Sequence, residues 1–171
     1  MLASCSSGQS ETANTEAALP MTGRVVDAAN ILDADTEQQL TARLALAETR
    51  YGPQMVVVTT PSLEGRNIED YSLDLANAWG IGDAKRDDGL LLMVAPNERK
   101  VRIEVGDGLE GPFSDAFSER ILGETILPKF SAGNLQAGII AGVDRMIAKM
   151  KAVAASPVND NEMSEAKKDA A

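Results

Sequence analysis

Histidine is absent from the 171 residues, and cysteine occurs once, at Cys5. Without histidine, the chain cannot carry Ser-His-Asp or Cys-His catalysis or any metal site that has a histidine ligand. A single cysteine excludes an internal disulfide bond and a structural zinc site built from several thiolates. Basic residues are also few, since 16 lysines and arginines stand against 26 aspartates and glutamates, for a formal net charge of -10. Nucleic acids and anionic membrane surfaces are therefore unfavourable partners.

Long apolar runs are missing too, and no segment is long and apolar enough to span a membrane as a helix. The hydrophobic content of 44% is nevertheless that of a globular protein. The length suits one folded domain with tails. We predict a leader and tether at residues 1–19, a domain at residues 20–154, and a disordered polar tail at residues 155–171.

The first residues contain a short motif, Leu2-Ala3-Ser4-Cys5. It resembles the lipobox of bacterial lipoproteins, where the signal peptide is cut before a cysteine that is then acylated. Residues 6–19 are small, polar and aperiodic, as in a flexible tether between a lipid anchor and its domain. The charged and apolar regions of a signal peptide do not precede the motif, so either the true start lies upstream of Met1 or the leader has been removed. The other reading is a stray cysteine in a disordered leader.

The centre of the chain predicts a β-hairpin. Gly89–Ala95 is a continuous apolar run, typical of a strand buried on both faces, and Lys100–Val105 alternates polar and apolar residues, as a strand with one wet face does. A turn at residues 96–99 joins the two strands, and a glycine-rich loop, Gly106–Gly111, follows them. The three glycines of this loop permit backbone shapes that a side chain would forbid.

Acidic residues flank this hairpin at Asp88, Asp107 and Glu110. The chain enters the first strand and leaves the second at neighbouring ends, so we expect these carboxylates on one rim of a sheet. Two carboxylates about 5 Å apart repel each other by roughly 3 kcal/mol at an effective dielectric constant of 20. The cluster therefore needs a cation, a basic partner or full exposure to water.

Hydrophobic periodicity and capping residues predict the remaining elements. We expect a minor strand near residues 24–26, a helix at 34–51 that begins after Asp33, a strand at 54–60, a helix from Asn67 to Trp79, a helix from Ser114 to about Leu127 that ends at Pro128, and a last helix after Gly133-Asn134 that ends at Ser156-Pro157. Strands joined through a crossover helix should be parallel, and the hairpin adds an antiparallel edge. The order predicts an α/β fold, a three-layer α/β/α sandwich with a small mixed sheet.

Several short stretches occur together in a fixed order: Val26-Asp27, Gln54–Val58, Ala78–Gly82, Asp88–Leu92, Val101–Glu110 and Leu127–Phe130. With this spacing, the chain from about Pro20 to Met150 resembles the TPM domain family, named for a thylakoid lumen protein of photosystem II repair and its relatives. The resemblance implies an α/β/α sandwich. Plant members have been described as acid phosphatases, and some domains of the family bind divalent cations such as calcium at an acidic cluster.

The resemblance also implies the site residues. The family's acidic positions correspond to Asp27, Asp88, Glu110 and Asp115, which we expect to bind Ca²⁺, or alternatively Mg²⁺, through carboxylate oxygens. Independently of the resemblance, Arg102 lies on the wet face or rim of its strand, and we expect it to pair with a carboxylate or to hold a phosphate. Each aspartate also has a structural alternative, because Asp27 could be a turn residue, Asp88 could cap the turn into its strand, and Asp115 could favour a helix N-terminus.

Three functions remain open at this point. The first is a cation-binding accessory or assembly module, a periplasm-facing lipoprotein of the bacterial cell envelope that acts on an unidentified envelope protein and contacts the membrane only through a lipid on Cys5. The second is a metal-dependent acid phosphatase, working through two metals or an aspartyl nucleophile. Nothing in the sequence marks a nucleophile, and the negative charge repels phosphoesters unless metals cancel it. The third is a structural adaptor without metal.

Overall fold

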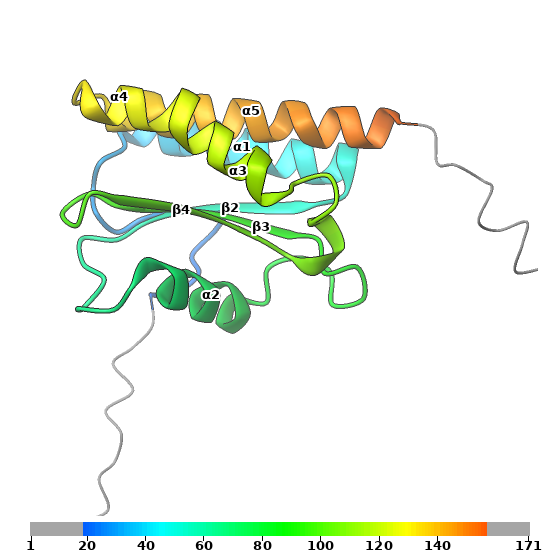
Figure 1. Cartoon of the computed structure of the whole chain (residues 1–171), viewed down its shortest axis with the longest axis horizontal. Coiled ribbons are helices and arrows are strands. Elements are labelled where there is room, and N and C mark those ends of the chain that lie inside the picture. Colours follow the sequence, from blue (N-terminus) through cyan, green and yellow to red (C-terminus); the bar gives the residue numbers. More distant parts are fainter. Residues whose placement is uncertain (1–18, 157–171) are drawn as a thin grey trace, which may run out of the picture.

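The computed structural model describes residues 19–156, and the structural statements below concern this part of the chain. A four-stranded sheet lies between two layers of helices (Figure 1). Its strand order is β1 (Val25–Asp27), β2 (Gln54–Thr59), β3 (Gly89–Ala95) and β4 (Lys100–Val105). The first three strands are parallel, and β4 pairs with β3 in the antiparallel direction. The predicted three-layer sandwich with a small mixed sheet is confirmed.

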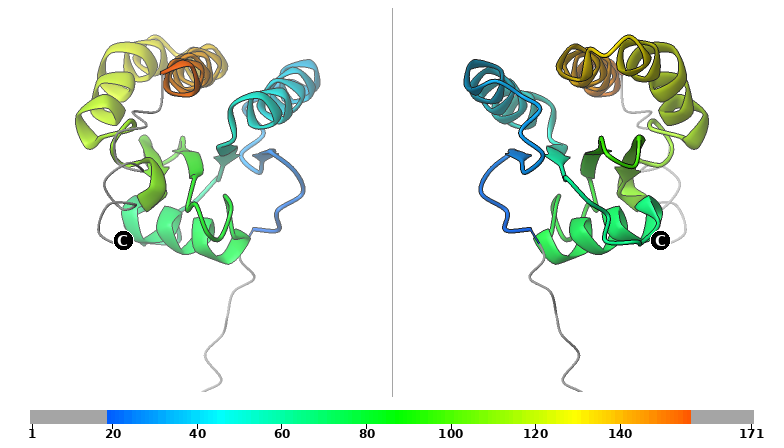
Figure 2. Two further views of the ribbon diagram at one scale, coloured as in Figure 1. Left: turned by 90° about the vertical axis from the view of Figure 1, so that its right-hand side faces the viewer. Right: turned by 90° about the vertical axis from the view of Figure 1, so that its left-hand side faces the viewer.

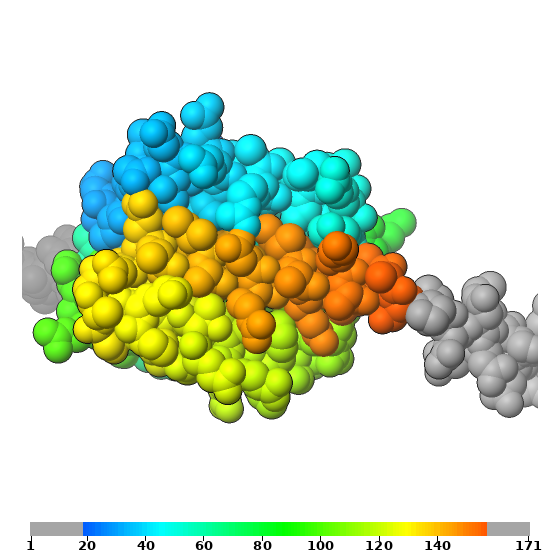
Figure 3. Space-filling view, turned by 90° about the horizontal axis from the view of Figure 1, so that it is seen from above, coloured from blue at the N-terminus to red at the C-terminus, as the bar shows by residue number. Residues whose placement is uncertain are grey.

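The two helical layers are unequal. One layer holds α1 (Ala34–Tyr51), α3 (Asp115–Ile121), α4 (Leu127–Ser131) and α5 (Leu135–Ala155), and the other holds only α2 (Ile68–Trp79). Figure 2 shows this separation end on, and Figure 3 shows α5 lying between α1 and the α3–α4 segment.

Alternate residues of the central strands enter different cores. Val57 and Leu92 pack with α1 and α5, whereas Val56, Val58 and Leu91 pack with α2. Because β2 and β3 are covered on both faces, their apolar residues do not alternate with polar ones. None of the helices in residues 19–156 combines the length and the apolar composition that a membrane-spanning segment needs.

The predicted N-caps of two helices are confirmed. The Asp33 carboxylate accepts a hydrogen bond from the Thr36 amide at 2.7 Å, and the Asn67 side-chain oxygen accepts one from the Asp70 amide at 2.6 Å. Each side chain satisfies an amide that has no partner within its helix.

We expect Asn67→Ala to lower the free energy of unfolding by about 1 kcal/mol, because the amide of Asp70 then loses its acceptor. Urea unfolding followed by circular dichroism measures this change. Asn67→Ser is the matched control, since serine also caps helices and should keep most of the stability. Equal losses in the two variants would show that the hydrogen bond to Asp70 is not what stabilises the start of α2.

The helix after Ser114 differs from its prediction. We expected it to end at Pro128, but the chain passes from α3 through a π-helical turn, η2 (Leu122–Ile126), into α4, which contains Pro128 near its start. In this turn the Leu127 amide donates to the Leu122 carbonyl, five residues back, instead of four as in an α-helix. The change comes directly before Pro128, which has no amide hydrogen to donate. Ser114 occupies the N-cap position of α3, but its side chain makes no capping hydrogen bond.

The glycine-rich loop after β4 packs against the loop before β3. It contains a short 3-10 helix, η1 (Asp107–Leu109). The Gly106 amide donates to the Gly89 carbonyl at 2.9 Å, and the Gly108 amide donates to the Asp87 carbonyl at 3.0 Å. A side chain on Gly108 would overlap the carbonyl oxygen of Arg86. Neither Gly106 nor Gly108 has a positive φ. Glycine is therefore needed here so that the two backbones can approach closely, and the prediction that it permits an unusual backbone conformation is wrong.

Candidate functional site

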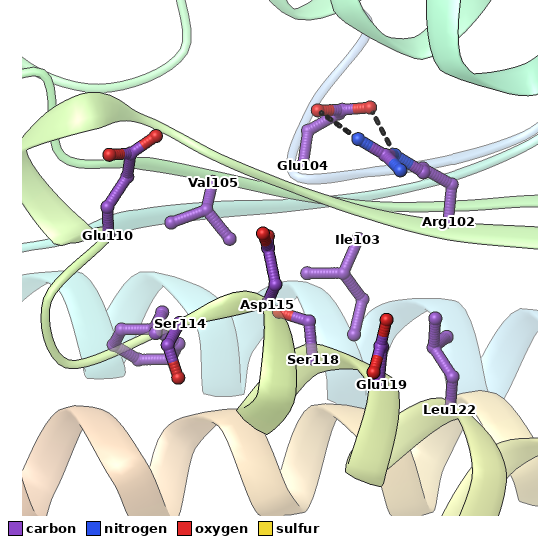
Figure 4. Close-up of a pocket in the computed structure, with 11 residues that line it drawn as sticks. Arg102, Ile103, Glu104, Val105, Glu110, Ser114, Asp115, Ser118, Glu119 and Leu122 are labelled. Atoms are coloured by element: carbon purple, nitrogen blue, oxygen red, sulfur yellow. Dashed lines mark hydrogen bonds and ion pairs between the residues drawn. The ribbon is translucent and has the colours of Figure 1, made fainter.

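A pocket of about 560 Å³ lies between the edge strand β4 and helix α3 (Figure 4). The edge strand supplies one wall, the loop after η1 closes one end, and α3 with the start of η2 supplies the other wall. The lining residues are Arg102, Ile103, Glu104, Val105, Glu110, Phe113, Ser114, Asp115, Ser118, Glu119 and Leu122.

Carboxylates dominate the polar lining of the pocket. Glu104, Glu110, Asp115 and Glu119 line it together with a single basic residue, Arg102. Four carboxylates against one guanidinium leave the pocket with a net negative charge, so a cation is favoured there and an anion is disfavoured.

Arg102 is already paired within the protein. Its Nε donates to Oε1 of Glu104 at 2.6 Å, and Nη2 donates to Oε2 at 3.4 Å. Hydrogen bonding to Glu104 raises the pKa of Arg102. The Ser72 hydroxyl of α2 donates to the same carboxylate at 2.6 Å. Arg102 therefore has a carboxylate partner, which was one of its two predicted roles.

Glu110 and Asp115 are both exposed and line this one pocket. Glu110 follows η1, and Asp115 occupies the first turn of α3, with its carboxylate directed toward β4 in Figure 4. Within residues 19–156, neither makes an ion pair with a lysine or arginine. Their carboxylates are free to meet a ligand. The structure thus brings together two of the four predicted ligands.

Asp88 does not line the pocket. It is only 5% exposed. Its Oδ1 accepts from the Asp83 amide at 2.9 Å, and its Oδ2 accepts from Nε of Arg86 at 2.7 Å. The Asp83 carboxylate accepts from the amides of Lys85 and Arg86, and these bonds lower the pKa of Asp83. Both oxygens of Asp88 are therefore used to close the loop before β3.

Asp27 lies at the other end of the sheet. It ends β1, and its register partner is Thr59, at the end of β2, whereas Asp88 precedes the start of β3. Because the strands are parallel, the two positions lie at opposite ends of the strands. Six residues of strand separate these ends by about 20 Å. The Asp27 carboxylate accepts from the amides of Ile31 and Leu32 at 3.2 and 2.8 Å and from the Thr59 hydroxyl. The structure does not bring Asp27 to the other three.

Within residues 19–156, no group of three or more histidine, cysteine, aspartate and glutamate side chains is arranged to hold a metal ion. Cys5, the predicted lipid attachment site, lies outside the described residues. The pocket holds two free carboxylates from the predicted set, Glu110 and Asp115, and they would need ligands from elsewhere to complete a cation site.

Two acidic lining residues escaped the sequence reasoning, Glu104 and Glu119. Glu119 follows Asp115 by four residues on α3, a spacing that places both side chains on one helix face. That spacing was available in the sequence. Glu104 gave no such signal, because a glutamate on the wet face of a strand is ordinary.

Comparisons with known proteins agree with this architecture. The TPM domain family matches residues 25–149. The solved N-terminal domain of a protein from P. gingivalis is 34% identical, with 77% of this chain and 84% of that chain covered and a TM-score of 0.72. Among curated proteins, none matches this chain.

Two further solved structures show the fold alone. The N-terminal domain of the cg2496 protein from Corynebacterium glutamicum is 16% identical, with 84% of this chain and 89% of that chain covered and a TM-score of 0.62. The BA42 protein from the psychrophilic bacterium Bizionia argentinensis is 21% identical, with 70% and 81% covered and a TM-score of 0.61.

Proposed function

Because this chain belongs to the TPM domain family, we propose that it is an accessory or assembly module that binds a divalent cation in the acidic pocket between β4 and α3. The observation that supports this proposal is that Glu110 and Asp115 are exposed, make no ion pair within residues 19–156 and line one pocket with Glu104 and Glu119. A pocket with this charge attracts cations.

We propose calcium as the cation, with magnesium as the alternative. Ca²⁺ takes six to eight oxygen ligands in flexible geometry, whereas Mg²⁺ requires near-ideal octahedral geometry. Glu110 and Asp115 would supply carboxylate oxygens, with water completing the shell. Asp27 and Asp88 are left out of this revised ligand set, because amides, a hydroxyl and Arg86 already occupy their oxygens. With few protein ligands, we expect a dissociation constant of about 10⁻⁴ M, in the range of extracellular modules.

We place this module in the bacterial cell envelope, on the periplasmic side, held to the membrane by a lipid on Cys5 and acting on an envelope protein. The motif Leu2-Ala3-Ser4-Cys5 and the small, polar residues after it support this placement. Labelling of cells with a fatty-acid analogue should mark the chain when it is expressed behind a bacterial lipoprotein signal peptide, and Cys5→Ser should remove the label.

A metal-dependent phosphatase has less support. A phosphate could be met there by bound metals or by a basic side chain, but Arg102, the one basic residue that lines the pocket, is bonded to Glu104 through two nitrogens. The remaining lining would repel a phosphoester unless bound metals cancelled its charge.

Calcium should stabilise the protein through this pocket. At 10 mM Ca²⁺, about a hundred times the expected dissociation constant, binding adds about 2.7 kcal/mol to the free energy of unfolding. For a domain of this size the Tm should rise by roughly 5 to 10 °C over the value in EDTA. The double variant Glu110→Gln with Asp115→Asn should lose this shift.

Asp35→Asn is the matched control, because Asp35 also lies in the first turn of a helix, on α1, and does not line the pocket. It should keep the full calcium shift. The proposal fails if no divalent ion moves the Tm, or if the double variant responds as strongly as the control. Hydrolysis of a phosphomonoester that needs Ca²⁺ or Mg²⁺ and disappears in the double variant would favour the phosphatase instead.

A further inference from the structure

The strand β4 has an unpaired edge. In an antiparallel pair, successive residues direct their amide and carbonyl groups alternately toward the partner strand and away from it. The Gly106 amide donates to the Gly89 carbonyl, so the bonded positions continue at Glu104 opposite Leu91 and Arg102 opposite Met93. The backbone groups of the intervening residues, Val101, Ile103 and Val105, therefore point away from β3.

Nothing in residues 19–156 hydrogen-bonds to these outward groups. No other strand pairs with β4, and no loop amide or carbonyl outside the sheet reaches Val101, Ile103 or Val105. The pocket occupies the space beside them, because Ile103 and Val105 line it, and Figure 4 shows α3 standing across the pocket from this edge.

The usual protections of an edge strand are weak here. Natural edges are shortened, kinked by bulges, interrupted by proline or studded with charges. β4 has six residues in continuous register, and none of them is proline. Two of its three charged residues, Arg102 and Glu104, are bonded to each other, so they do not oppose an incoming strand as free charges would. The third, Lys100, is exposed at the start of the strand and protects only that end.

The chemistry of the pocket identifies what fits this edge. Val105 and Leu122 are partly exposed and provide apolar surface, and Glu110, Asp115 and Glu119 provide negative charge. A second copy of this chain would bring the same carboxylates and a net charge of -10 against them, which is unfavourable. A basic and partly apolar segment complements both features.

We propose that β4 accepts an extended segment of a partner protein, carrying lysine or arginine between apolar residues, as a fifth strand of the sheet. Strand addition supplies main-chain hydrogen bonds for affinity, and side-chain pockets supply specificity. This inference rests on the proposed role as an interaction module, and it names the chemistry of the partner at the same pocket.

The test uses a short peptide of alternating lysine and valine, acetylated and amidated at its ends, and the protein labelled for NMR. In the free protein the amides of Ile103 and Val105 should exchange rapidly with solvent, because they have no acceptor. Saturating peptide should slow their exchange by about tenfold or more. The double variant Asp115→Asn with Glu119→Gln should lower the affinity for the peptide by about tenfold, and Asp35→Asn should leave this affinity unchanged.

Two N-methylated peptides separate strand addition from charge attraction. In an extended strand, alternate amides face the same side. One peptide is methylated at every lysine amide and the other at every valine amide, so that opposite edges of the peptide strand are blocked. One peptide should bind like the parent, and the other should lose binding. Equal affinity of the two, or binding without protection of Ile103 and Val105, would overturn the inference.

Two other outcomes concern the occupant. Protection of Ile103 and Val105 that rises with protein concentration, together with dimer formation, would assign the edge to a second copy and overturn the inference. Calcium stabilisation without peptide binding would also overturn it, and would leave the proposed cation site standing. Peptide binding without any calcium effect would overturn the proposed cation site and leave strand addition standing, so the two failures are distinguishable.

Discussion

Gly108→Ala should lower the free energy of unfolding by about 3 kcal/mol, one of the two largest effects we expect from a single substitution. The added Cβ would overlap the carbonyl oxygen of Arg86, and the Gly108 amide is already bonded to the Asp87 carbonyl at 3.0 Å. Both obstacles are backbone, so no side chain can rotate away. The two loops must separate, which adds the cost of overpacking to that of a lost hydrogen bond.

Gly111→Ala is the control for this prediction. Nothing lies within 4 Å of a Cβ built at Gly111, and the variant should remain within about 0.5 kcal/mol of the wild type. Urea unfolding of both variants measures the difference. If the two alanines cost the same, close approach of the loops before β3 and after β4 is not what selects glycine at position 108.

Asp88→Ala should cost a similar amount, about 3 kcal/mol. The carboxylate is buried, and its removal takes away the acceptor of the Asp83 amide and of Nε of Arg86. Hydrogen bonds to charged groups contribute about 1.5 to 3 kcal/mol each, and two of them are lost here. Asp88→Asn keeps an oxygen for the amide, so we expect a smaller loss, about 1 kcal/mol.

Asp107→Ala serves as the matched control, because Asp107 is an exposed aspartate in the neighbouring loop. It should change stability by no more than about 0.5 kcal/mol. The same set tests the assignment of Asp88 as a structural residue. If Asp88→Asn leaves stability unchanged but removes the calcium shift, Asp88 is a ligand and its bonds to the loop are dispensable.

Local patterns in the sequence predicted most of the fold. The apolar run at Gly89–Ala95 and the caps at Asp33 and Asn67 each depend on interactions within a few residues, and the structure confirms them. Pro128 was misjudged because a proline normally stops a helix, and no local pattern in the sequence marked the π-helical turn that precedes it.

The candidate site was predicted less well, and Asp27 shows why. It was grouped with Asp88 because of a family resemblance. Such a resemblance compares positions along the chain and does not say how far apart they lie in space. The predicted fold already opposed this grouping. Asp27 lies at the end of one parallel strand and Asp88 lies before the start of another, which places them at opposite ends of the sheet's strands.

The pairing of Asp88 with Arg86 was beyond prediction. The run Lys85-Arg86-Asp87-Asp88 offers several charge pairs, and the turn at Asp83 selects among them.

The placement of α1 and α2 has a topological consequence. Strands β1, β2 and β3 lie side by side in chain order and run parallel, so both crossover connections step in the same direction across the sheet. Their helices nevertheless cover opposite faces. One crossover is therefore right-handed and the other left-handed, although about 98% of such connections are right-handed. Strand twist favours the common hand, so the unusual crossover must be held by the packing of its helix against the sheet.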